Sequence, residues 1–182
     1  MLPRFNDDGL LPPGDYQLTI DQLKACMLVT GAGAERPDWD VNWRMRLVCS
    51  LEALVGQLWE VGITSSICIG GSFVEDRNHP HDIDGYFYCD DREFLSGQLE
   101  MRLNQLDPFQ AWNWDRCSRT PDARGKMHYP LWHRYRVDLF PNIGQGTGVF
   151  DDAGNERSFY SLMRWSHRVG RLRGVILLRR SQ

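Results

Sequence analysis

The stretch ICIGGSFVEDRNHPHDIDGYFYC, residues 67–89, contains two strand-like runs that are separated by a glycine turn and a polar segment. The first run, ICIG, is short, apolar and branched, and it ends in a Gly-Gly-Ser turn at residues 70–72. Glycine is favoured where a chain turns sharply out of a strand. The second run, IDGYFYC, directly follows Asp82 and contains Asp84. The stretch therefore predicts two neighbouring strands, with two aspartates where the second strand begins.

Helical patterns lie on both sides of these strands. After Asp40, leucine and valine recur at spacings of three and four residues as far as Val61. This spacing predicts an amphipathic helix of about 20 residues, which Gly62 can close. A second pattern, DREFLSGQLEMRLNQL at residues 91–106, predicts a helix with one leucine stripe. The stripe contains Leu95, Leu99 and Leu106.

A third strand is expected much later in the chain. WHRYRVDLF, residues 132–140, alternates between apolar and polar side chains, which predicts a strand with Asp138 on its polar face. The expected apolar face contains Tyr135, Val137 and Leu139. A short helix at residues 157–165 and a final strand at residues 174–180 complete the pattern.

These elements predict an α+β fold with a small mixed sheet and helices packed on one face. The length of 182 residues fits one domain of ordinary size. We expect a single domain over residues 1–182. Within it, residues 1–38 form an extended lead-in with a short helix, and residues 157–182 form an arginine-rich helix and strand.

Composition excludes several classes of protein. Hydrophobic residues make up 42% of the chain and aromatic residues 12%, which argues against a disordered or fibrous protein. No apolar run approaches the roughly 20 residues that span a bilayer, and the amino-terminal sequence lacks the layout of a signal peptide. We therefore expect a cytoplasmic protein without a membrane partner.

Charge is distributed unevenly along the chain. All 24 acidic residues lie at or before Glu156, whereas residues 157–182 contain seven arginines and no acid. This asymmetry has two explanations: the C-terminal segment docks on the acidic body, or it offers a phosphate-binding or nucleic-acid-binding face.

The aspartates indicate a metal site. Residues two apart in a strand face the same side, so Asp82 and Asp84 would lie side by side, with Cα atoms about 6.5–7 Å apart. Hard oxygen ligands favour Mg²⁺ or Mn²⁺. If Asp138 faces the same patch, three carboxylates can hold two ions about 3.5–4 Å apart, as in phosphoryl-type displacement. Gly71 and Ser72 offer a close backbone approach and a hydroxyl donor to a phosphate.

Two segments carry a family resemblance. IGGSFVEDRNHPHDIDGYFYC, together with YRVDLF, resembles the signature of the DNA polymerase β-type nucleotidyltransferase superfamily. That signature is a strand ending in Gly-Ser, a short helix, an Asp-x-Asp strand and a lone Asp on a later strand. The segments LPPGDY, GGSFVEDRNHPHDIDG and GRLRGVILL resemble a group of small bacterial proteins with this fold, some of which occur in toxin–antitoxin or phage-defence operons.

The resemblance implies an activity and roles for residues. Asp82 and Asp84 would bind the metals, Asp138 would assist as a ligand or activate the incoming hydroxyl, and Gly71 with Ser72 would hold the triphosphate. The implied enzyme transfers a nucleoside monophosphate from an NTP to a hydroxyl of RNA, protein or a small molecule. The alternative is a non-catalytic module of the same fold that binds nucleotide, RNA or a partner protein, as an antitoxin or regulatory subunit would. A metal-dependent phosphoesterase is a third possibility.

Other polar residues keep two interpretations each. The aspartates could instead cap a turn or pair with arginine. The polar residues at issue in the predicted loops are His79, His81, Arg124, Lys126 and His128. The first two could ligate a metal or contact the substrate, and the last three could reach a phosphate tail. Each could instead be an ordinary loop residue. Trp112, Trp114 and Trp132 are expected to anchor the long loop at residues 109–130 rather than to stack on bases.

Overall fold

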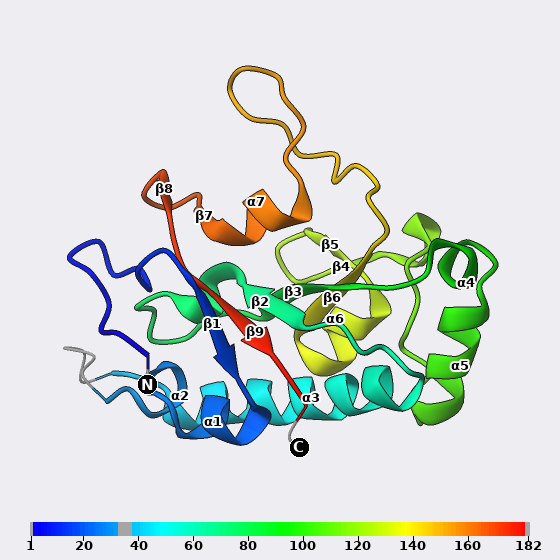
Figure 1. The fold of residues 1–182 in the computed structure, drawn as a ribbon, viewed down its shortest axis with the longest axis horizontal. Coiled ribbons are helices and arrows are strands. Elements are labelled where there is room, and N and C mark those ends of the chain that lie inside the picture. Colours follow the sequence, from blue (N-terminus) through cyan, green and yellow to red (C-terminus); the bar gives the residue numbers. More distant parts are fainter. Residues whose placement is uncertain (1, 33–37, 181–182) are drawn as a thin grey trace.

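A five-stranded mixed sheet forms the centre of the protein in the computed structural model, which describes residues 2–32 and 38–180 (Figure 1). The order across the sheet is β1 (Asp15–Leu18), β9 (Val175–Leu178), β2 (Ile67–Gly70), β3 (Ile83–Tyr88) and β6 (Val137–Asn142). The outer pairs β1–β9 and β3–β6 are parallel, and β2 is antiparallel to both of its neighbours. The protein is therefore a mixed α/β structure with a central mixed sheet.

Helices and two short hairpins surround the sheet. The helices are α1 (Ile20–Ala25), α2 (Met27–Thr30), α3 (Val41–Glu60), α4 (Asp91–Leu95), α5 (Gln98–Leu106), α6 (Pro130–Tyr135) and α7 (Phe159–Arg164). Two 3-10 helices are η1 (Gly71–Val74) and η2 (Arg116–Ser118). The hairpins are β4 (Thr120–Pro121) with β5 (Met127–His128), and β7 (Trp165–Ser166) with β8 (Arg171–Leu172).

Helix α3 covers one face of the sheet and closes the main core (Figure 1). The Asp40 side chain caps it by accepting a hydrogen bond from the backbone N–H of Trp43, and the helix ends at Glu60, just before Gly62. The leucines of the predicted stripe are buried against the sheet: Leu47, Leu51, Leu54 and Leu58. The predicted helix is confirmed, because both its apolar period and its end signals are local.

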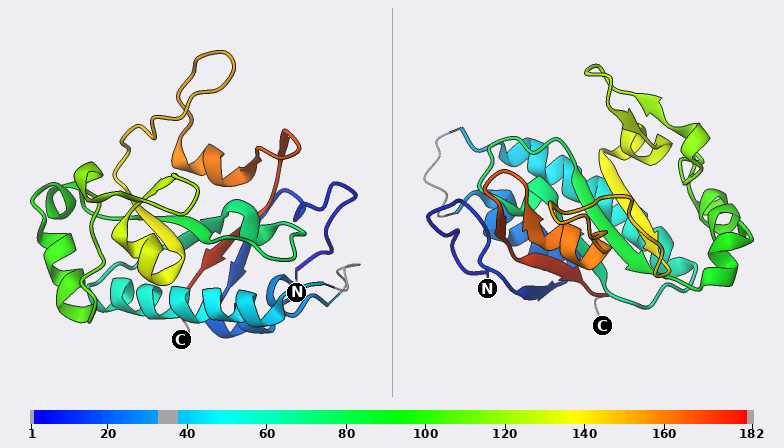
Figure 2. Two further views of the ribbon diagram at one scale, coloured as in Figure 1. Left: turned by 180° about the vertical axis from the view of Figure 1, so that it is seen from behind. Right: turned by 90° about the horizontal axis from the view of Figure 1, so that it is seen from above.

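The prediction of helices on one face only is wrong, because α7 lies over the opposite face of the sheet (Figure 2). A smaller apolar cluster forms between α7 and this face. Met163 and Phe159 of α7 pack there against Cys68 and Tyr86 of the sheet. This cover is short, because α7 has only six residues. Helix α7 therefore covers only part of this face, and the remainder can carry polar side chains.

Three predicted elements differ from the structure. The helix predicted over residues 91–106 is divided into α4 and α5 by Gly97, whose φ is +76°, so that Leu95 is 73% exposed. Residues 130–135 are helical rather than extended, and only the second half of the predicted strand pairs with β3. The lead-in contains β1, because its four residues find a parallel partner in β9.

None of the helices within the described residues has the length and apolarity that crossing a membrane requires.

Candidate functional site

Three aspartates converge at one edge of the sheet. Asp84 in β3 and Asp138 in β6 are direct partners in the parallel register, and Asp82 lies just before β3. One carboxylate oxygen from each residue lies within 4.8 Å of the others. Asp82 is buried, and Asp84 and Asp138 are half-buried. The structure thus brings together all three aspartates that the sequence singles out.

The electrostatics of this cluster favour a bound cation. Burial, followed by the charge of Asp82, raises the pKa of Asp84 to about 7. Burial, followed by the charges of Asp84 and Asp82, raises the pKa of Asp138 to about 8. A divalent cation would offset both the lost hydration and the mutual repulsion. Because all the donors are carboxylate oxygens, the set fits Mg²⁺ or Mn²⁺ better than a softer metal.

The Gly-Gly-Ser turn lies directly against this cluster. Gly70 is the register partner of Asp84 on the side away from β6. Gly71 has a φ of +69°, and a Cβ added there would overlap the Asp84 carboxylate. Glycine at this position is therefore required both by the backbone conformation and by the close approach. Ser72 follows, half-buried, in the 3-10 turn η1.

The β4–β5 hairpin and α6 hold the aspartates from the other side. The Trp132 indole Nε1 donates a 2.7 Å hydrogen bond to Asp82 Oδ2. The His128 ring stacks on Trp132, with ring centroids 3.6 Å apart, and its Nδ1 lies 3.7 Å from Asp138 Oδ2. Burial lowers the pKa of His128, which favours the neutral ring. Trp132 is therefore a buried anchor, as expected, and it also positions a carboxylate.

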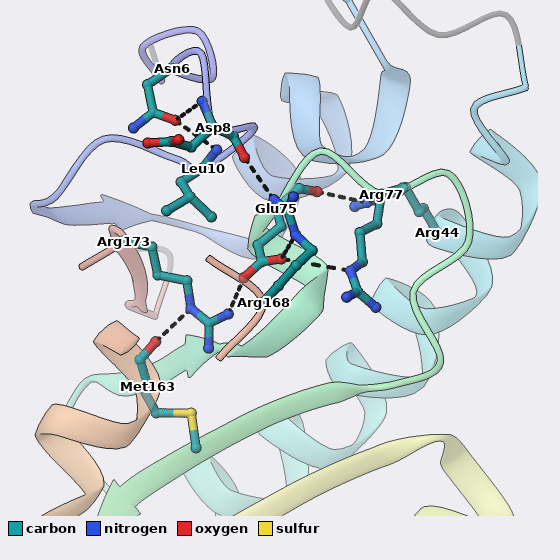
Figure 3. Close-up of polar contacts among 9 residues, drawn as sticks. All are labelled: Asn6, Asp8, Leu10, Arg44, Glu75, Arg77, Met163, Arg168 and Arg173. Carbon is teal, nitrogen blue, oxygen red and sulfur yellow. Dashed lines mark hydrogen bonds and ion pairs between the residues drawn. The ribbon is translucent and has the colours of Figure 1, made fainter. Parts of the chain in front are cut away.

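Acidic Glu75, just after the turn, is neutralised by arginines (Figure 3). Glu75 is 2% exposed, and its Oε1 lies 2.5 Å from Arg173 Nη1. Its Oε2 lies 3.2 Å from Arg168 Nε and 3.6 Å from Arg77 Nε. Arg173 Nε also donates to the Met163 carbonyl at 3.0 Å. The Glu75 carboxylate is therefore paired with arginines, although it directly follows the glycine turn.

The C-terminal arginines dock on the acidic body. Besides the pairs with Glu75, Arg164 lies 2.5 Å from Asp15, and Arg171 lies 2.6 Å from Asp8. Of the two explanations for the charge asymmetry, the structure supports internal pairing for these arginines. The contacts with Asp15 and Asp8 hold α7 and β8 against the N-terminal segment.

Of the remaining residues that the sequence singled out, some have a structural role and others line a cavity next to the aspartates. His79 Nδ1 contacts Asp40 Oδ2 at 2.9 Å and stacks on Trp43, so it braces the start of α3. Trp112 and Trp114 pack in or against the main core, as expected of anchors. His81, Arg124, Lys126 and His128 instead line a cavity that also contains Asp82.

Two site residues were missed by sequence reasoning. Arg136 lines the same cavity because it is the left-handed C-cap of α6, not a strand residue. The signal was Pro130, which is typical of a first helical turn. Arg173 lies close enough to Asp84 to favour its charged form. No local pattern could have identified Arg173, because its partners are distant in sequence.

Comparisons with known proteins give one match. A family model described as "Family of unknown function (DUF6932)" matches residues 3–178. No curated protein and no solved structure matches the chain. The matched range includes every residue of the aspartate cluster, the turn and the hairpin, but it assigns them no activity.

Proposed function

The chain belongs to the DUF6932 family, and we propose that it is a metal-dependent nucleotidyltransferase of the polymerase β-type fold. It would transfer a nucleoside monophosphate from an NTP to a hydroxyl and release pyrophosphate. The observation that carries this proposal is the convergence of Asp82, Asp84 and Asp138 beside the glycine turn. A role in a toxin–antitoxin or phage-defence system is part of the same proposal and rests on the family resemblance alone.

Asp82, Asp84 and Asp138 are the residues that would hold Mg²⁺ or Mn²⁺. When bound, such ions neutralise charge on the attacking and leaving oxygens of a phosphoryl displacement. The chain contributes fixed positions for these carboxylates. Two of them are held by the sheet register, and the third is held by the Trp132 hydrogen bond.

The turn and Asp138 have different tasks in this proposal. Gly71 leaves its backbone open to a nucleotide phosphate close to Asp84, and the Ser72 hydroxyl supplies a donor. Asp138 lies on the other side of Asp84, where the acceptor hydroxyl would enter. Once ionised, the Asp138 carboxylate would accept the proton from that hydroxyl. Most of the rate enhancement would come from positioning and charge neutralisation.

The test is pyrophosphate release from each labelled NTP, with Mg²⁺ and with total RNA or a cognate protein as acceptor. We expect the rate to fall by about 10²–10³-fold in Asp84→Asn and Asp82→Asn, as when a transition-state contact is removed. Asp152→Asn, in an exposed turn, serves as the matched control and should keep the wild-type rate.

Two outcomes would contradict catalysis. Release that is unchanged in both site variants would show that the aspartates are not responsible. NTP binding measured by calorimetry, without any release, would instead identify a non-catalytic nucleotide-binding module.

A further inference from the structure

A basic cavity adjoins the aspartates on the side of the β4–β5 hairpin. It has a volume of about 260 Å³, and Asp82 forms part of its wall. We call it the basic cavity because most of its polar lining consists of cationic and imidazole side chains. These are His81, Arg124, Lys126, His128 and Arg136.

The cations of the basic cavity lack a direct carboxylate partner, although the charge of Lys126 acts favourably on the ionised forms of Asp84 and Asp138. Within residues 2–32 and 38–180, Arg124, Lys126 and Arg136 form no ion pair with a carboxylate. Asp122 lies in the same lining, but its Oδ1 accepts hydrogen bonds from the backbone N–H groups of Arg124 and Lys126, both at 2.9 Å. It thereby orders the turn that presents them. The C-terminal arginines, by contrast, are paired with Asp8, Asp15 and Glu75.

The cavity is built to accept an anion rather than a base. Trp132 is the indole in its wall, and its ring is covered by His128 at 3.6 Å between centroids and by the Arg136 guanidinium at 3.9 Å. These contacts leave little of the ring for stacking on a nucleobase. Arg136 has a φ of +56°, which is unusual for a residue with a side chain. Such a conformation persists where the surrounding structure enforces it, and functional sites are a common place for it.

The basic cavity and the glycine turn lie on opposite flanks of the aspartate cluster. Across the sheet, Gly70 of β2, Asp84 of β3 and Asp138 of β6 are in register in that order. The glycine turn continues from β2, whereas α6 leads into β6 and His128 contacts Asp138. A nucleotide phosphate held at Gly71 would leave the basic cavity free for a second molecule.

We propose that the basic cavity binds a phosphate group carried by the acceptor. This inference rests on the proposed function, because it names the substrate class that the transferase would modify. The acceptor hydroxyl would then lie beside Asp138 while the acceptor phosphate contacts Arg124, Lys126 and Arg136. A nucleic acid strand and a small phosphorylated molecule share this chemistry, whereas an unmodified protein side chain does not.

The test measures binding of a fluorescein-labelled single-stranded RNA to the full chain by anisotropy over a range of salt concentrations. The variant is the double substitution Arg124→Gln with Lys126→Gln, at two exposed positions. The matched control is Arg134→Gln, an exposed arginine of α6 that stacks on Phe109 instead of lining the basic cavity. For single-stranded nucleic acid, a plot of log K against log salt concentration has a slope of about −0.7 for each phosphate contact. Removal of one contact therefore reduces the magnitude of the slope by about 0.7. We expect the double variant to bind at least about tenfold more weakly, with a slope smaller by about 1.4, and the control to match wild type.

A competition arm distinguishes the two sources of phosphate. Competition by inorganic phosphate and a nucleoside 5′-monophosphate at concentrations similar to those of RNA would identify a small acceptor. Failure of both to compete would identify a nucleic acid. Either result supports the inference if the double variant weakens the binding by at least about tenfold.

The inference is overturned if wild type binds neither RNA nor phosphate, or if the double variant binds them as wild type does. It is also overturned if the double variant weakens NTP binding as much as acceptor binding, because the cavity would then hold the nucleotide. RNA binding requires no turnover, so absent pyrophosphate release would count against the proposed function and leave this measurement unaffected.

Discussion

Gly71 is required both by the backbone conformation of the turn and by the close approach of Asp84. Its positive φ would strain any other residue, and its missing side chain makes room for the Asp84 carboxylate. Gly148 has a similar φ of +72°, but a Cβ there would meet nothing within 4 Å. Replacing Gly148 by alanine therefore adds only the strain of a positive φ. Replacing Gly71 adds both that strain and an overlap with Asp84.

We predict that Gly71→Ala lowers the free energy of unfolding more than Gly148→Ala does. The control should cost about 1 kcal/mol for conformation alone. Gly71→Ala should cost about 2–4 kcal/mol, because Asp84 must also move. Urea unfolding measures both values, and equal losses would show that the overlap is relieved without cost.

Asp84 and Asp138 make the stability of the metal-free protein depend on pH. Both pKa values are raised above those of the unfolded chain, so the folded state binds more protons between about pH 4 and pH 8. Their contribution to stability is therefore complete below the ordinary aspartate pKa and is lost as pH rises through about 7 to 8.

We predict that Asp138→Asn flattens this dependence. Without metal, the substitution should raise Tm at about pH 8.5 by about 2–4 °C for each kcal/mol of repulsion that it removes, and should do little at about pH 5. Thermal unfolding in EDTA measures this shift. Added Mg²⁺ should stabilise wild type increasingly with pH, because binding requires the ionised carboxylates. If Asp138→Asn instead lowers Tm at about pH 8.5, the ionised carboxylates do not destabilise the metal-free protein by repulsion.

At the scale of elements, the Glu75 cluster joins the turn η1 to the C-terminal hairpin. Glu75 follows η1 and pairs with two arginines (Figure 3). Arg168 lies in the turn between β7 and β8, and Arg173 directly follows β8. Arg173 is 7% exposed, and the Glu75 carboxylate, 2.5 Å away, compensates its buried charge. The position of the glycine turn is thus supported by a segment from the far end of the chain.

We predict that Glu75→Gln destabilises the protein by about 3–5 kcal/mol, because it leaves buried Arg173 without its partner. Glu52→Gln is the matched control. Glu52 pairs with Lys24 at the surface and is 45% exposed, so its loss should cost less than about 1 kcal/mol. Urea unfolding of the two variants gives the comparison, and similar small losses would show that the Glu75 cluster is not structurally required.

At the scale of the whole molecule, the two ends of the chain share the sheet. β9, near the C-terminus, lies between β1 and β2 and pairs with both. Its Val175, Ile176 and Leu178 are fully buried. The arginine-rich C-terminal segment therefore contributes a central strand, β9, to the core.

We predict that a chain lacking residues 173–182 does not unfold cooperatively, because removal of β9 separates β1 from the sheet and leaves the edge of β2 unpaired. Far-UV circular dichroism with thermal unfolding tests this. Shortening the exposed turn at residues 151–155 should leave a cooperative transition. A cooperative transition in the truncated chain would mean that β9 is dispensable.

Local signals were sufficient for several parts of the protein. The helix between Asp40 and Gly62 is specified by its apolar period and its end residues. The strand, glycine turn and strand at residues 67–89 are also local. Asp84 lies in β3 as predicted, whereas Asp82 directly precedes β3 and is held by the Trp132 hydrogen bond. Strand alternation in residues 132–140 added Asp138, so the three aspartates were predicted from the sequence, whereas Arg136 and Arg173 were not.

Tertiary structure decided what those signals left open. Residues 91–106 and 130–135 have ambiguous local patterns, and packing against the sheet and α3 selected a divided helix and a short helix. The pairing of Glu75 with Arg173, 98 residues apart, and the gathering of Arg124, Lys126 and Arg136 around one cavity depend on which distant segments meet. Periodicity and capping act within a few turns of chain, whereas charge pairing and cavity formation act through space. The sequence by itself therefore determined the long helix, the two strands around the glycine turn and the aspartates. Only the folded chain decided which charges form ion pairs and which line the basic cavity.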